Sequence, residues 1–161
     1  MQERLLDVLN LSTNFHTDDG VVCAVNNLSF QVNKGESVCI VGESGCGKSV
    51  TSMSIMRLLK SPPAEITGQI QFEGKDLLKL SNDEMCRIRG YEIAMIFQVP
   101  MKALNPLFTC GYQISEVLRM HQGLDKRAAR KQAVELMRMV GIPIPEKRVN
   151  NFPHQLSGGM R

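Results

Sequence analysis

One octapeptide governs the interpretation of this chain: Gly42-Glu43-Ser44-Gly45-Cys46-Gly47-Lys48-Ser49. It matches the pattern G-x-x-x-x-G-K-[ST]. The apolar run SVCIV at 37–41 comes directly before it and predicts a strand buried on both faces of a parallel sheet. A helix is predicted after it, from about Gly47 to Leu59, and Pro62-Pro63 should stop that helix. A strand, a glycine-rich loop and a helix in this order predict a phosphate-binding loop, or P-loop.

The chemistry expected of this loop follows from its residue types. Glycines let the backbone turn its N–H groups toward phosphate oxygens, and the following helix adds its positive end. Lys48 would contact the β- and γ-phosphates, and the Ser49 hydroxyl would ligate Mg²⁺. We therefore predict ATP and Mg²⁺ as ligands of residues 42–49 and the adjacent Val50. A glycine-rich turn that binds nothing is the alternative. Alkylation of Cys46, inside the loop, is hypothesised to block ATP binding.

The chain before the loop has the pattern of a small antiparallel β region. Its strand-like runs are LLDVLNL, VVCAV and LSFQV, and they close at a turn over 33–36. After the loop, GQIQFEG at 68–74 predicts a strand and EIAMIF at 92–97 predicts a second buried strand.

Helical patterns fill most of the rest. Ser81, with Glu84 three residues on, marks the start of a helix over 81–89. Two longer helices are predicted at 111–121 and 124–140, the second ending at Gly141. The alternation of strands and helices places the chain in the α/β class.

Composition narrows the class of protein. With 161 residues, 43% hydrophobic and 22% charged, the chain suits a globular domain, neither a disordered tail nor a membrane span. The net charge of +3 is small and dispersed, so no nucleic-acid partner is expected. The densest basic stretch, at 126–131, suits a solvated helix face better than an anionic-partner site. Five cysteines without a C-x-x-C pair favour reduced thiols in the cytoplasm.

Two further stretches carry a family resemblance. LSGGMR at 156–161 and AMIFQVPMKALNP at 94–106 accompany the loop in VGESGCGKS. Together they resemble the signature motif, the Q-loop and the P-loop of ABC transporter ATPases, over essentially the whole chain. The sequences MIFQ, LNP and FPHQLSGGMR resemble those of the subfamily of dipeptide, oligopeptide and nickel importers.

The resemblance implies roles for further residues. Phe15 is placed like the aromatic that stacks on adenine, although a core aromatic remains the alternative. Gln98 matches the residue that senses Mg²⁺ and the attacking water. Ser157, Gly158 and Gly159 match the residues that contact ATP held on an opposing subunit. His154 is given no catalytic role, because the family's switch histidine lies beyond the signature.

The resemblance also implies an organisation and partners. We expect an antiparallel β region at 1–36, a P-loop core at 37–110 and a helical subdomain at 111–161. The expected partners are transmembrane permease subunits, a second ATPase subunit and, indirectly, an extracytoplasmic solute-binding protein. The expected location is peripheral, on the cytoplasmic face of the cell membrane. The expected role is to energise the import of di- or oligopeptides, or of nickel.

Hydrolysis in that family needs parts that the sequence does not contain after the loop: a strand ending in Asp-Glu (the Walker B motif and catalytic glutamate) and the switch histidine. We therefore expect a fragment without the C-terminal half of the cassette, which hydrolyses ATP only at background rate. A non-catalytic nucleotide-binding fragment and a soluble ABC protein outside transport remain as alternatives.

Overall fold

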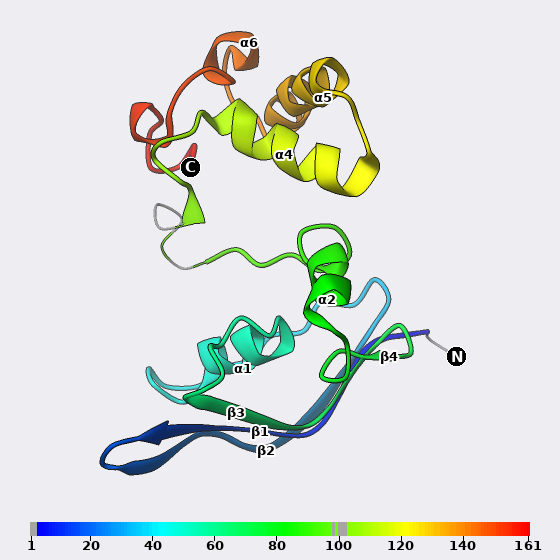
Figure 1. Ribbon diagram of the computed structural model, residues 1–161, viewed down its shortest axis with the longest axis vertical. Helices are drawn as coiled ribbons and strands as arrows, with labels where there is room; N and C mark the ends of the chain where they lie inside the picture. Colours follow the sequence, from blue (N-terminus) through cyan, green and yellow to red (C-terminus); the bar gives the residue numbers. More distant parts are fainter. Residues whose placement is uncertain (1–2, 98, 100–102) are drawn as a thin grey trace. The chain divides into compact units, whose positions relative to one another are not determined.

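The computed structural model describes residues 3–97, 99 and 103–161. The chain divides into two compact units, Met1–Arg89 and Gly90–Arg161, which are described separately. The first holds a sheet and two helices, and the second is helical (Figure 1). The finer partition at residues 36 and 110 stays a prediction.

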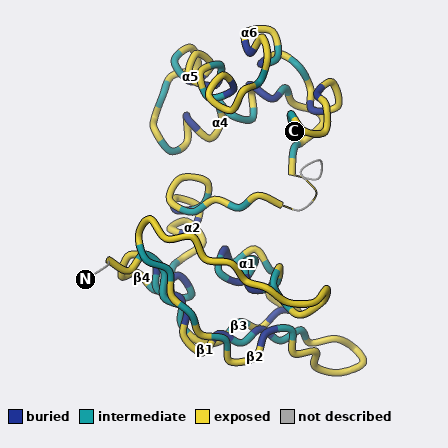
Figure 2. Tube along the Cα trace, turned by 180° about the vertical axis from the view of Figure 1, so that it is seen from behind, coloured by how far each residue is buried: buried dark blue, intermediate teal, exposed yellow. Residues whose placement is uncertain are grey.

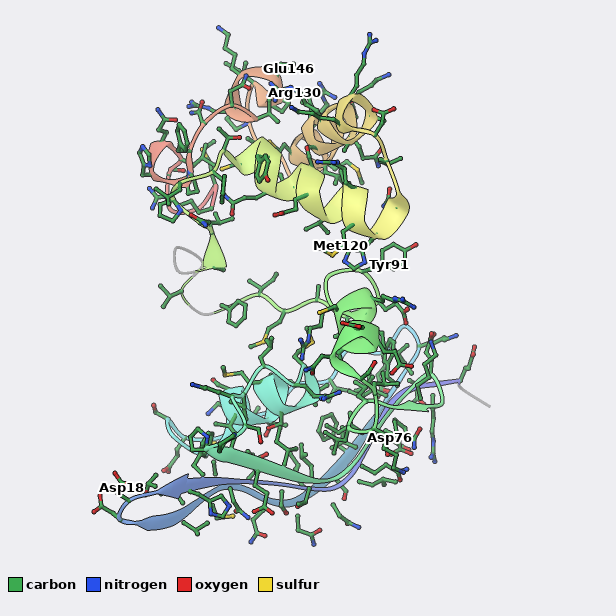
Figure 3. All side chains as sticks on the ribbon, viewed as in Figure 1. Asp18, Asp76, Tyr91, Met120, Arg130 and Glu146 are labelled. Atoms are coloured by element: carbon green, nitrogen blue, oxygen red, sulfur yellow. The ribbon has the colours of Figure 1, made fainter. Side chains whose placement is uncertain are left out.

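A four-stranded antiparallel sheet forms the first unit. Its strands are β1 (Arg4–Thr17), β2 (Gly20–Asn33), β3 (Ala64–Phe72) and β4 (Lys75–Asp76), in the order β2-β1-β3-β4. Asp18, labelled in Figure 3, lies at the tip of the β1–β2 hairpin. The predicted antiparallel region and the strand at 68–74 are thus confirmed. The runs VVCAV and LSFQV are one strand rather than two, because the chain passes through a left-handed Asn27 (φ 48) without leaving the sheet.

Helix α1 (Lys48–Ile55) lies over one face of this sheet (Figure 1). It is shorter than the predicted 47–59, because Arg57 takes a left-handed conformation with φ 49. The guanidinium of Arg89 donates to the carbonyls of Met56 and Arg57, at 2.7 and 2.6 Å, and so satisfies backbone groups at this end of the helix.

Helix α2 (Asn82–Ile88) begins as the sequence predicts. The Ser81 hydroxyl accepts from the Glu84 N–H at 3.3 Å, and the Ser81 N–H donates to the Glu84 carboxylate at 2.8 Å. This capping box fixes the first turn, while Met85 and Ile88 enter the core. Figure 2 shows that core between the sheet and α1. Its fully buried apolar side chains are Val8, Leu11, Ile70, Leu77 and Met85.

The two apolar runs that were predicted as buried strands, at 37–41 and 92–97, do not form strands in the structure. Residues 37–41 have no strand structure and are exposed, with Val41 at 87%. Residues 92–97 form no strand either, and Ile96 is 92% exposed. These two predictions were wrong as local structure. A parallel strand exists only through its neighbours, and no strand among the described residues pairs along either run.

The second unit packs helices α4 (Cys110–Gln122), α5 (Lys126–Met139) and α6 (Pro145–Arg148), followed by the 3-10 turn η1 (Pro153–Gln155). The two predicted long helices are confirmed. Asp125 caps α5 by accepting from two backbone N–H groups, and Gly141 at φ 77 follows its end. The buried core of this unit consists of Leu118, Ala129, Ala133, Met137 and Val149.

Candidate nucleotide-binding site

Gly47 lets the glycine-rich loop pack closely against strand β2 of the sheet. It has φ 88, and a Cβ atom there would lie 2.3 Å from the Ala24 carbonyl oxygen. Ala24 is the extra residue of a β-bulge in β2, because Thr13 pairs with Val25 and Asn14 with Cys23. Only glycine permits both this backbone angle and this close approach. The loop is therefore fixed against β2 immediately before α1 begins.

The Lys48 ammonium lies within the loop. Its Nζ donates to the carbonyl oxygens of Gly42 and Glu43 at 2.7 and 2.6 Å, and it contacts the Cys46 sulfur at 3.3 Å. The Cys46 N–H donates to the Glu43 carbonyl at 3.3 Å and closes the turn. The ammonium thus donates to three atoms of the loop itself, on Gly42, Glu43 and Cys46. This geometry concentrates positive charge where the loop curves.

The start of α1 offers backbone donors. No side chain caps this helix, and its first turn holds no acidic residue. Within the described part of the chain, the N–H groups of Gly47, Lys48 and Ser49 have no hydrogen-bond acceptor. Unpaired N–H groups and the helix dipole together attract anions. The Ser49 hydroxyl is on the exposed side of this turn, and Val50 is half-buried behind it.

Buried hydroxyls attach α1 to its surroundings. The hydroxyls of Thr13 on β1 and Ser54 on α1 lie 2.9 Å apart, and both side chains are 0% exposed. Thr51, also buried, donates to the Gly47 carbonyl at 3.0 Å. The sequence did not reveal these residues. Helix α1 reads KSVTSMSI, whose scattered polar residues define no buried face, and Thr13 is one of several polar residues on its strand.

Phe15 lies two residues beyond Thr13 on β1. It pairs with Val22 and Ala64 in the neighbouring strands and is half-buried. Burial alternates along the strand, with Leu11 and Thr13 buried, so Phe15 belongs to the face that carries α1. Gln98 lies outside the described residues. Beside the loop, a pocket of about 280 Å³ is lined by Ala24, Val25, Asn26, Leu28, Ile40, Val41, Cys46, Lys48 and Thr51.

The LSGG stretch in the second unit forms a single turn. The N–H groups of Met160 and Arg161 donate to the Ser157 carbonyl at 3.1 and 3.2 Å. Leu156 is buried and anchors the turn, whereas Ser157, Gly158 and Gly159 are exposed. Added Cβ atoms on Gly158 and Gly159 would meet nothing within 4 Å. The described chain itself therefore does not require glycine at these two positions.

No group of three or more His, Cys, Asp or Glu side chains in the described residues could hold a metal ion. The loop fits a magnesium nucleotide differently, because one hydroxyl, that of Ser49, and phosphate oxygens would supply the ligands. The N–H groups without acceptors and the ammonium described above would provide complementary charge for phosphates.

A glycine-rich loop between a sheet and a helix, with unpaired N–H groups at the start of that helix, is typical of α/β nucleotide-binding proteins. The ABC transporter family model matches residues 25–161. The chain belongs to this family. The fold agrees with a solved ATP-binding cassette, MJ0796, described as a dimer bound to ADP and Pi. The TM-score is 0.79 at 27% identity, over 97% of this chain and 65% of that one.

Curated relatives indicate the subfamily. The oligopeptide transport ATP-binding protein OppD of Bacillus subtilis is 56% identical over 98% of this chain and 44% of its own length. The dipeptide transport ATP-binding protein DppD of the same organism is 53% identical over 99% of this chain and 48% of its own length. The chain spans about half the length of these relatives. Among the helices described, none combines the length and apolar character needed to cross a membrane.

Proposed function

We propose that this chain is the nucleotide-binding part of an ATP-binding subunit that energises peptide import. The observation that carries the proposal is the loop at 42–49, where the Lys48 ammonium lies against the loop carbonyls and the N–H groups at the start of α1 have no acceptor among the described residues. Two relatives named for oligopeptide and dipeptide transport support peptides, rather than nickel, as the solute class.

Phosphate binding in this proposal is an exchange of partners at Lys48. Its Nζ leaves the carbonyls of Gly42 and Glu43 and takes phosphate oxygens, while the N–H groups of Gly47, Lys48 and Ser49 donate to the same anion. Ser49 would hold Mg²⁺ through its hydroxyl, and Gln98 would approach the metal and the attacking water. Magnesium would neutralise charge on the phosphates during hydrolysis by the whole protein.

The other proposed contacts complete a two-subunit site. Phe15 would stack on adenine at the sheet side. Ser157, Gly158 and Gly159 would contact ATP bound by a second copy or a related subunit, which supplies a reason for glycines that nothing in the described chain demands. The proposed further partners are permease subunits, and through them a solute-binding protein. The proposed location is the cytoplasmic face of the membrane.

The test replaces Lys48 by alanine and measures affinity for MgATP by calorimetry. Loss of one charge-assisted contact to phosphate should weaken binding at least tenfold, since such bonds contribute roughly 1.5–3 kcal/mol. Lys60→Ala removes an exposed lysine elsewhere in the same unit and should leave affinity unchanged. Equal affinities of Lys48→Ala and the unmodified chain, with both folded by circular dichroism, would refute the proposal.

A further inference from the structure

The hydrogen bond between Thr13 and Ser54 joins the two sides of the proposed nucleotide site. Ser54 lies on α1, the helix that starts in the phosphate loop, and Thr13 lies on β1, the strand that carries Phe15. The two hydroxyl oxygens lie 2.9 Å apart, and both side chains are fully buried. Ser54 also donates to the Val50 carbonyl at 2.7 Å, one turn earlier in α1. The bond therefore reaches from the strand to the backbone of the helix that follows the loop.

Among the residues that the structure describes, no second hydrogen bond joins β1 to α1. Thr51, the remaining buried polar residue in the described chain, bonds within its own segment, to the Gly47 carbonyl. Gly47 touches β2 at Ala24, but this is a van der Waals approach at a bulge, where pairing with β1 is interrupted. At a bulge the regular ladder between two strands is interrupted. Among the described residues, the bond between Thr13 and Ser54 is therefore the direct polar link between β1 and α1.

We propose that Thr13 is a positioning residue for nucleotide recognition, holding the base side of the site, on β1, at a fixed distance from the phosphate side, on α1. This inference rests on the proposed function, because it takes Phe15 as the base contact and residues 42–49 as the phosphate contact. Phe15 is two residues from Thr13, roughly 7 Å along the strand, so a shift at Thr13 moves the ring directly.

The inference predicts that loss of the Thr13 hydroxyl changes the affinity for ATP but not the affinity for tripolyphosphate. ATP touches both sides of the site, whereas tripolyphosphate, which has no base, touches the loop only. Thr13→Val keeps the shape of the side chain and removes its hydroxyl, and Ser54 retains the Val50 carbonyl as a partner. We expect this variant to bind MgATP about fivefold more weakly, the loss typical of one buried hydrogen bond. Affinity for magnesium tripolyphosphate should not change.

Calorimetry with both ligands on the full chain tests this. Thr13→Ser restores a hydroxyl and should restore ATP affinity, and Thr67→Val, an exposed threonine on β3 of the same sheet, should have no effect. In a Phe15→Ala background, Thr13→Val should cost nothing further, since its effect passes through the ring. Should Thr13→Val fail to fold by circular dichroism, Ser54→Ala removes the same bond and must show the same split.

The outcomes separate the inference from the function on which it rests. Unchanged ATP affinity in Thr13→Val, equal weakening of both ligands, or a Phe15→Ala variant that binds ATP normally would each overturn the inference while leaving phosphate binding by the loop intact. Failure of the unmodified chain to bind either ligand would instead refute the proposed function, and the inference with it.

Discussion

Cys46 lies inside the glycine-rich loop, against Gly42 and Lys48. Its sulfur lies 3.3 Å from the Lys48 ammonium, and a Cβ atom on Gly42 would come within 2.5 Å of it. The thiol is nevertheless exposed. We therefore expect a group attached to this sulfur to compete with the Lys48 ammonium for space at the loop.

Treatment with N-ethylmaleimide should accordingly abolish MgATP binding. Mass spectrometry establishes that Cys46 is modified, and calorimetry then measures MgATP binding. The matched control is Cys46→Ser, which should bind ATP and keep binding it after treatment. Cys110 should react last, because burial raises the pKa of its thiol and lowers the thiolate fraction. Undiminished affinity with Cys46 fully alkylated would contradict this role of the loop.

The sequence predicts some of these residues and not others. The glycines and Lys48 could be predicted as candidate site residues, because a short motif encodes the local backbone geometry and charge that they provide. Thr13 and Ser54 could not, since their bond joins residues 41 positions apart and depends on how a helix rests on a sheet. Gln98 and the ATP contacts of the LSGG turn stay predictions.

The start of α2 shows how a local signal fixes an element. The Ser81 hydroxyl donates to the Glu84 carboxylate at 2.7 Å and accepts from the Glu84 N–H, and the backbone N–H of Ser81 reaches the same carboxylate. The backbone N–H of Ser81 first, and then its hydroxyl, hold the pKa of Glu84 below its ordinary value of 4.5.

Ser81→Ala should lower the free energy of unfolding by about 1 kcal/mol at neutral pH, the usual effect of losing an N-cap. Because the pKa of Glu84 is lower when folded, the stabilisation is complete above pH 4.5 and is lost as the pH falls through the folded value. The difference between the variant and the unmodified chain should therefore shrink in acid. Urea unfolding at several pH values measures it.

The control for this pH effect is Glu84→Gln, which keeps an acceptor for the Ser81 N–H but cannot ionise. Its stability should lack the part of the acid dependence that the capping box supplies. An identical loss of stability in acid for Glu84→Gln and the unmodified chain would show that this carboxylate is not responsible.

Gly111 on α4 lies close against Val149 in the second unit. A Cβ atom there would lie 2.2 Å from Val149 Cγ2 and 2.5 Å from the Val149 carbonyl oxygen, which accepts from the Gly111 N–H. Gly111→Ala should therefore lower the free energy of unfolding of this unit by about 2 kcal/mol. Gly158→Ala, where space is open, serves as the control. Equal melting temperatures for the two variants would contradict this packing.

The elements that the sequence predicts are those with local causes. Helices α2, α4 and α5 have caps and periodicity written within their own residues. The runs at 37–41 and 92–97 carry no such signal. Their apolar character predicts burial in a parallel sheet, and strand structure there depends on distant neighbours that the described residues do not supply.

The residues of the proposed nucleotide contacts are distributed over the two units of the chain. The phosphate loop, Phe15 and Thr13 belong to Met1–Arg89, and the LSGG turn belongs to Gly90–Arg161. In the proposal, the phosphate and base contacts to the nucleotide bound by the loop therefore come from Met1–Arg89. The family and the α/β class could be predicted from three separated motifs, whereas the transported solute rests on the relatives' names.

Calorimetric titration of the unmodified chain with MgATP, MgADP and AMP tests the proposed phosphate cradle most directly. In the proposal the loop contacts the phosphate chain. MgATP and MgADP should therefore bind, whereas AMP, with a single phosphate, should bind at least a hundredfold more weakly, a difference of roughly 2.7 kcal/mol. Binding of AMP as tight as that of MgATP, or no heat with MgATP on folded protein, would contradict it.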